Sequence, residues 1–438
     1  MTSSLERRKQ SGQALVLVVL MIVALVGAVG LSIDIGNAVA HQRTDQSAAD
    51  SAALAAADRL SSGSTIAVAT SAGIAVASLA GVPSGNLTIN YLDSGRLPTT
   101  NILSVVWVQA KVTESVATFF MRMIGISTSN VSALAEVKYP KKCALCFLHP
   151  NASPALDISS SGGLSVTGGC VQVNSNANPA ATLTSGGGIT APCTNVVGTV
   201  TGAGPVAPPA TTGVAPVPDP LAKLPYPTGA MTSYGSIAPG GTDINLQPGL
   251  YNRWDLGGSG GLVLSAGTYV ITGGIAVSSG GGIRNCPVGP CPAGITPGGV
   301  TLFMTCSNWV PTSPAAGPIC APCPVYGADI QVSSNGGITV TAPTSGTYQG
   351  VAIFYDRCNS GDLAITANGG VPVTGAIYAM SAPLKITANG PLTVKGLVVT
   401  ATTQISANGS LTIAYDPTDP AQAVNASWLN WGNVRLVV

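Results

Sequence analysis

Charge and histidine are scarce in this chain of 438 residues. Only 8% of the residues are charged, the formal net charge is +1, and there are two histidines. This balance gives no long-range attraction for nucleic acid, so we expect no nucleic-acid partner. A Ser-His-Asp site would depend on His149, which lies beside Pro150, and the sequence contains no nucleophile elbow to accompany it.

Carboxylates are also few where a polysaccharide-active β-helix enzyme would need them. Residues 141–438 contain no glutamate, and their aspartates do not recur at one position of a repeat. Glycoside hydrolysis usually needs paired carboxylates, and the best cluster here is Asp356, Arg357 and Asp362. No phosphate-binding lysine follows the glycine runs. We therefore expect no catalytic residue, no cofactor and no metal, with a polysaccharide-active enzyme as an alternative.

Glycine and proline, by contrast, are abundant, with 54 and 32 residues. Such a composition is often disordered, but 46% of the residues are hydrophobic, and disordered chains are poor in such residues. We therefore expect a folded chain whose surface is built from Ser, Thr, Asn and Gly.

A glycine-bearing motif recurs through the last two-thirds of the chain: an apolar residue, a short polar step, a corner and another apolar residue. Its corner glycines are Gly163, Gly187, Gly281, Gly336, Gly369, Gly390 and Gly409. The copies at Ile386–Leu392 and Ile405–Leu411 are 19 residues apart, and apolar residues alternate with Lys and Thr around them. A fixed period of this length is typical of solenoids, and the corners predict a backbone with positive φ.

The sequence thus predicts a mainly β fold, a right-handed parallel β-helix (solenoid) of roughly ten coils stacked about 4.8 Å apart. This domain should span residues 141–438, with a Pro-rich insertion at about 200–227 and a C-terminal cap over the last coil from Tyr415 onward. Antiparallel hairpins are the alternative, because Asn-Gly is also a strong hairpin signal.

The N-terminus begins with a basic tip, Arg7-Arg8-Lys9, followed by an uncharged run over residues 11–33. The expected transmembrane residues include Ala14, Leu15, Leu20, Leu25, Leu31 and Ile33. Such a run can cross a bilayer as a helix, and the basic tip places its N-terminus in the cytoplasm. We expect a single-pass cytoplasmic membrane protein with its bulk outside; a cleaved signal peptide is the competing interpretation.

Alanine dominates the sequence after the apolar run. Ala49, Ala52, Ala53 and Ala56 fall on one face of a helix, which is either a packing seam for another backbone or part of a solvated helix. This helix closes a first domain, residues 1–60.

Residues 61–140 predict a small α+β domain, a helix followed by an antiparallel sheet. Within it, Phe119-Phe120 should fill the core; the alternative is contact with the membrane surface or a partner.

Ten cysteines lie outside the anchor: Cys143, Cys146, Cys170, Cys193, Cys286, Cys291, Cys306, Cys320, Cys323 and Cys358. An even number in an exported chain favours disulfides that pin loops, with pairings that the sequence leaves open. Zinc binding at Cys143-x-x-Cys146-x-x-His149 and Cys320-x-x-Cys323 is the alternative.

Three N-terminal motifs, in order, resemble TadE/TadG-like proteins of Tad (Flp) pilus assembly: Gly12-Gln-Ala-Leu15, Ile33-Asp-Ile-Gly36 and the run from Gln46 to Ala57. Related pilin-like proteins are processed after a Gly and carry Glu five residues later. Leu17 takes that place here, which argues against prepilin-type cleavage and polymerisation.

Three later segments are similar to the repeats of the C-terminal β-helical region of TadG-like proteins: 247–251, 265–269 and 374–383. The resemblance implies a membrane-anchored, exported structural or interaction protein, with the lipid bilayer and Tad pilus or secretion proteins as partners. An adhesin or glycan-binding module is the alternative.

Overall fold

The computed structural model describes residues 7–61, 64–93, 95–100, 105–138, 143–184, 186–309, 326–333, 336–366, 371–387, 391–429 and 435–437. The chain divides into two compact units, residues 1–140 with 433–438, and residues 141–432.

The first unit is built on one long helix, α1 (Arg7–Ser61), and a second helix, α2 (Ile66–Leu79). The hydroxyl of Thr65 caps α2 by accepting a hydrogen bond from the backbone of Val68. An antiparallel sheet in the order β1-β2-β3-β33 completes the unit. Its strands are β1 (Leu87–Leu92), β2 (Trp107–Ala117), β3 (Thr128–Lys138) and β33 (Arg435–Val437). The predicted small α+β domain is thus present, and it continues the anchor helix.

The alanine face of α1 is a packing seam. Ala49, Ala52, Ala53 and Ala56 are fully buried in the core of this unit. A Cβ placed on Gly73 of α2 would lie only 2.9 Å from the backbone oxygen of Ala52. Because small side chains on both helices permit this approach, the solvated-helix alternative is wrong.

The second unit is the predicted solenoid. Each full coil contributes one strand to each of three faces, and every ladder between its described strands is parallel, as at β18–β21, β25–β28 and β29–β32. The first face holds β4 (Cys143–Phe147), β7 (Cys170–Val173), β10 (Thr194–Val196), β13 (Thr211–Thr212), β14 (Ser233–Ile237), β16 (Gly249–Leu256), β18 (Gly267–Ile271), β21 (Val300–Met304), β24 (Val351–Tyr355), β27 (Ala376–Ala379) and β30 (Val398–Thr400).

The second face continues the same sheet, because β16 is long enough to pair with β18 on one face and β19 on the other. It holds β5 (Leu156–Ser160), β8 (Ala181–Leu183), β11 (Val200–Gly202), β19 (Ile275–Val277), β22 (Ile330–Val332), β25 (Leu363–Ile365), β28 (Leu384–Ile386) and β31 (Thr403–Ala407). The third face is a ten-stranded sheet: β6 (Gly163–Thr167), β9 (Gly188–Thr190), β12 (Val206–Ala207), β15 (Ile244–Leu246), β17 (Leu262–Leu264), β20 (Ile283–Asn285), β23 (Ile338–Thr341), β26 (Val371–Thr374), β29 (Pro391–Lys395) and β32 (Ser410–Ala414).

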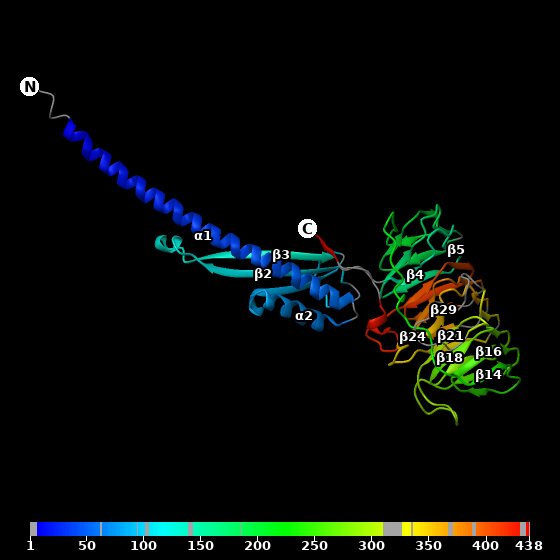
Figure 1. Cartoon of the computed structure of the whole chain (residues 1–438). Coiled ribbons are helices and arrows are strands. Elements are labelled where there is room, and N and C mark those ends of the chain that lie inside the picture. The colour runs from blue at the N-terminus through cyan, green and yellow to red at the C-terminus, as the bar shows by residue number, and fades with distance from the viewer. Residues whose placement is uncertain are drawn as a thin grey trace, which may run out of the picture. The chain divides into compact units, whose positions relative to one another are not determined.

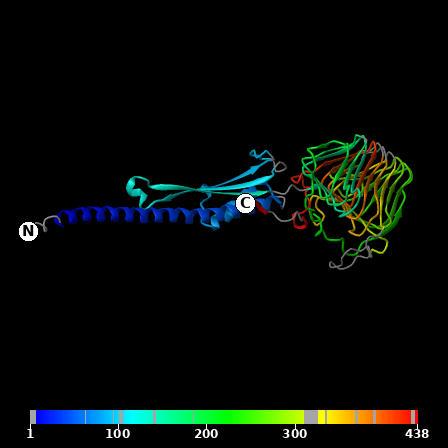
Figure 2. The same cartoon turned by 90° about the horizontal axis from the view of Figure 1, so that it is seen from above.

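The coils are not stacked in the order of the sequence. The coil of residues 398–414 pairs with the coil of residues 143–167 on all three faces, as β30–β4, β31–β5 and β32–β6. In Figure 1 the orange β29 accordingly lies near the teal β4 and β5. The chain therefore enters the stack in its interior, winds to one end at β12 and β13, and resumes at the opposite end with β14 and β15. Figure 2 shows the coils of this unit side by side.

Two boundaries expected from the sequence are wrong. The segment from Tyr415 does not cap the last coil, because the coil of residues 143–167 already covers it; instead the Trp428 indole donates to the Thr347 carbonyl, and β33 pairs with β3 of the first unit. Residues 200–212 are not part of a Pro-rich insertion but form β11 to β13. Residues 213–232, here called the connector, link β13 to β14.

The corner glycines are needed for different reasons. Gly163 has the predicted positive φ of 144°, but at the next motif it is Gly186, beside Gly187, that has one, and Ala407 takes it in place of Gly409. Gly369 and Gly390 lie outside the described residues.

Gly281 and Gly336 have no positive φ, which corrects the prediction for them. A Cβ on Gly336 would overlap the carbonyl oxygen of Gly281, and one on Gly281 would overlap that of Gly260, one coil further along. Glycine stands here because the next coil lies too close for a side chain.

Candidate functional site

The apolar part of α1 is exposed along its length. Among the described residues, α1 is the one helix that is long and apolar enough to cross a membrane. Leu15, Leu20 and Leu25 are 60–68% exposed, and Leu31 and Ile33 nearly half. Such a surface is unfavourable in water, which suggests a single-pass membrane anchor.

The turn between β2 and β3 lies against α1 where the apolar run ends. Residues 118–127 form this turn, here called the hairpin tip, with the short 3-10 helix η3 (Met121–Ile124) at its centre. The ring of Phe120 packs where a side chain of Gly30 would stand, since a Cβ there would lie 2.5 Å from the ring. Figures 1 and 2 both show the tip beside α1.

Asp34 fixes the backbone of the hairpin tip. Its Oδ1 accepts a hydrogen bond from the amide of Phe119 at 2.7 Å, and its Oδ2 accepts from Phe120 at 3.0 Å and Met121 at 2.7 Å. The carboxylate is only 4% exposed, so these three donors replace the water that a buried charge loses.

The expectation that Phe119-Phe120 fills a core is wrong. Phe119 is 65% exposed and Phe120 38%, and Met123 and Ile124 are 84% and 76% exposed. The core is filled instead by the alanines of α1 and the inward residues of β2 and β3. Periodicity could not reveal this, because the tip is held by a residue 85 positions away in sequence.

We predict that Asp34→Asn loosens the tip. An amide group has one acceptor oxygen, so the donors on the other side would face an NH₂ group. Hydrogen exchange at one or more of the Phe119, Phe120 and Met121 amides should accelerate roughly tenfold or more, since a bond to a charged acceptor contributes about 1.5–3 kcal/mol. Asp50→Asn, on the same helix but bonded to Gln46, should leave these amides unchanged; unchanged exchange in Asp34→Asn would contradict the prediction.

A small pocket of about 270 Å³ opens further along α1, lined in part by His41, Asp45 and Glu114. His41 Nδ1 and Glu114 Oε2 are 3.2 Å apart. Asp45 is 2% exposed, and its Oδ2 has no hydrogen-bond partner among the described residues. In the part of the chain that the structure describes, neither these three side chains nor any other group of three or more His, Cys, Asp and Glu is arranged so that it could hold a metal ion.

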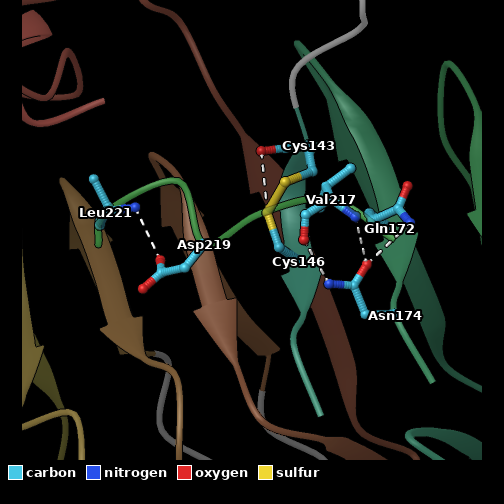
Figure 3. Close-up of a disulfide and its surroundings, with 7 residues drawn as sticks. All are labelled: Cys143, Cys146, Gln172, Asn174, Val217, Asp219 and Leu221. Carbon is cyan, nitrogen blue, oxygen red and sulfur yellow. Dashed lines mark hydrogen bonds between the residues drawn. A yellow bond between two sulfur atoms is a disulfide. The ribbon is translucent and has the colours of Figure 1, made fainter. Parts of the chain in front are cut away.

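The cysteines that the structure describes form disulfides. The three pairs between described residues are Cys143–Cys146, Cys170–Cys193 and Cys286–Cys291. Cys306 and Cys358 are disulfide-bonded too, while Cys320 and Cys323 lie outside the described residues. The thiolates of Cys143 and Cys146 are consumed in their own bridge (Figure 3), so the zinc site proposed with His149 has lost two of its three ligands.

The Cys170–Cys193 bridge holds two neighbouring coils together, because β7 and β10 are paired strands. We expect Cys170→Ser with Cys193→Ser to lower the free energy of unfolding by about 2–4 kcal/mol, through the larger entropy of the unfolded loop. Replacing Cys286 and Cys291 by Ser frees a loop of sequence separation 5. This change should lower the free energy of unfolding by less. Guanidinium unfolding measures both, and equal costs would contradict the loop argument.

The connector crosses coils that are far apart in sequence. Asn174 exchanges two hydrogen bonds with the backbone of Val217, at 2.8 and 3.0 Å (Figure 3). Further along, the Tyr378 hydroxyl donates to Asp219 Oδ2 at 2.7 Å. Burial raises the pKa of Asp219, against the lowering effect of the Tyr378 hydrogen bond.

Arg357 fastens the connector at its centre. Its Nη2 donates to the carbonyls of Leu221 and Leu224 at 3.0 and 2.6 Å, and its guanidinium lies 4.9 Å from the ring centroid of Tyr226. Tyr226 in turn stacks on Phe354. Arg357, one of the three residues of the cluster Asp356, Arg357 and Asp362, is therefore engaged in contacts within the solenoid.

The two carboxylates of that cluster are engaged as well. Asp356 is fully buried and accepts from the Cys358 amide at 3.1 Å. Asp362 Oδ2 accepts from Lys385 Nζ at 2.8 Å.

Together these features define a class of protein: one long apolar helix, a small α/β unit continuous with it, and a parallel β-solenoid. A family model described as "Putative Flp pilus-assembly TadE/G-like" matches residues 12–59. The match covers the apolar run, Asp34 and the alanine seam, and it confirms the resemblance of the N-terminal segment. No curated protein and no solved structure matches the chain.

Proposed function

We propose that this chain is a membrane-anchored, exported structural or interaction component of Tad (Flp) pilus assembly or a related envelope machine. The observation that carries the proposal is the family match over residues 12–59, which coincides with the helix suited to cross a membrane. The same segment forms the seam on which α2 and the sheet pack. The matched region is therefore both anchor and structural base of the first unit.

The orientation we propose is N-terminus inside and bulk outside. Arg7, Arg8 and Lys9 lie at the start of α1, and basic residues remain on the cytoplasmic side. The disulfides favour an oxidising compartment for the solenoid. Alkaline phosphatase fused after the last residue should be active in cells, while β-galactosidase there should not; the reverse result would overturn the orientation.

The role we propose is not catalytic, and the anchor is retained rather than cleaved. Asp356, Arg357 and Asp362 all have structural partners, which supports the first point. Deleting the gene in its source bacterium should abolish surface filaments seen by electron microscopy, and the full chain should restore them. Normal filaments in the deletion strain would refute the pilus role, and a mature N-terminus beyond Gly30 would refute the retained anchor.

A further inference from the structure

The hairpin tip carries an apolar surface that the first unit leaves uncovered. Phe119, Met123, Ile124 and Ile126 are 65%, 84%, 76% and 47% exposed. These side chains follow one another along a single turn, and the one charged residue among positions 118–127 is Arg122. Exposed apolar side chains gathered in this way mark a surface that contacts a membrane or another protein.

This surface continues the apolar surface of α1. Phe120 packs on Gly30, and the tip backbone is bonded to Asp34. Val29 and Ile33 of the helix, flanking Gly30, are themselves 58% and 47% exposed. The tip is therefore at the level where the apolar run of the anchor ends, which is where the hydrocarbon of a bilayer gives way to headgroups.

The tip is also fixed in shape before it meets any partner. Thr118 and Ser127 are joined by a backbone hydrogen bond of 3.1 Å, and the Ile126 amide donates to the Met121 carbonyl at 3.0 Å. Gly125 takes the left-handed conformation that ends η3. With the Asp34 bonds added, the apolar side chains are held outward without an ordering cost on binding.

We propose that the hairpin tip inserts into the membrane interface beside α1, as a second point of attachment for the first unit. Phe119, Met123, Ile124 and Ile126 enter the boundary between headgroups and acyl chains, and Arg122 meets the lipid phosphates. Two attachments, a helix and a tip clamped to it by Asp34, fix the tilt of the first unit on the membrane, which one helix alone would leave free.

The proposal rests on the membrane anchor of the proposed function, and its test separates the two. A photo-crosslinking phenylalanine derivative replaces Met123 in the full chain, held in nanodiscs of phosphatidylethanolamine and phosphatidylglycerol. Lipid adducts are measured by mass spectrometry. The same probe at Leu20 reports on the anchor. The probe at Leu97 is the matched control, an apolar side chain 65% exposed in the same unit. It lies beside the start of β2, about 30 Å from the tip at ~3.3 Å per residue of strand.

The Met123 probe should form lipid adducts roughly tenfold more often than the Leu97 probe, because only the tip would lie among lipids. A probe at Ile126 should give the same result, which covers the case that the probe at Met123 disturbs the turn. Labelling at Leu97 level from both tip positions, with strong labelling from Leu20, would overturn the insertion and leave the anchor intact. Adducts to a second copy of the chain or to another protein would overturn it as well, and absent labelling from Leu20 would overturn the anchor itself.

Discussion

Gly281→Ala should lower the free energy of unfolding by about 2–3 kcal/mol, the cost typical of a group forced into a closely packed site. The added methyl group would overlap the carbonyl oxygen of Gly260 in the neighbouring coil. That oxygen cannot turn aside, because it belongs to the backbone of the stack. Relief requires the two coils to separate, which strains the flanking ladders of β17 and β20.

The matched control is the adjacent glycine. A Cβ on Gly280 meets nothing within 4 Å, and the residue is exposed. Gly280→Ala should leave the unfolding free energy unchanged or raise it by about 0.4–1 kcal/mol, because alanine restricts the unfolded chain. Guanidinium unfolding followed by circular dichroism compares the two variants. Equal stabilities would show that the spacing between coils does not demand glycine at this corner.

Arg357→Met should release the connector. The substitution keeps an unbranched apolar stem but removes the donors to the carbonyls of Leu221 and Leu224, residues that are 0% and 1% exposed. A buried acceptor left without its donor costs about 1–3 kcal/mol, and the contact of the guanidinium with Tyr226 is lost too. The variant should therefore lose about 2–4 kcal/mol of the free energy that keeps the connector closed on the coils.

Lys223 makes this loss directly measurable. It is the one trypsin site in the connector, is exposed, and lies between Leu221 and Leu224. Cleavage there tracks the population of the opened segment, so it should accelerate roughly hundredfold, the equivalent of about 2.7 kcal/mol. Arg357→Lys should be cleaved at a rate between those of the unchanged chain and Arg357→Met, since an ammonium group lacks the planar fork that reaches both carbonyls.

Arg284→Met is the control for loss of an arginine. Its guanidinium pairs with Asp243 at 2.6 Å, with both side chains more than 40% exposed, and such surface pairs contribute about 0–1 kcal/mol. Cleavage at Lys223 should not change in this variant. If Arg357→Met also left cleavage unchanged, the connector would be held by its other contacts, such as Asn174 with Val217.

Local patterns predicted the elements of this protein because their causes are local. Alternating residues around Leu384 and Leu392 gave the strands, and the exposed run around Leu20 gave the anchor helix. The alanine spacing indicated a helical face, although only the structure decided that α2 packs on it. The corner motifs located the turns but predicted a positive φ for every corner glycine. Gly163 has a positive φ, whereas Gly281 is needed because the next coil lies too close for a side chain.

Long-range order was beyond these patterns. All coils have similar apolar edges, so no local pattern predicts which coil lies beside which. The pairing of β32 with β6, a strand from the start of the solenoid, could therefore not be predicted. The position of the connector follows from that order, because it must travel back along the stack from β13 to β14. The exposure of the hairpin tip likewise depends on Asp34, on a different element.

The amino-acid sequence by itself thus determined the apolar anchor, the alanine face and a parallel solenoid, since periodicity and residue size act over a few positions. The tertiary structure alone decided the order in which the coils stack, the partners of the buried arginine and the outward turn of the hairpin tip. These three features depend on contacts between residues that are far apart in the sequence. The free energy of those contacts is spread over several elements, so no short stretch of the chain reveals it.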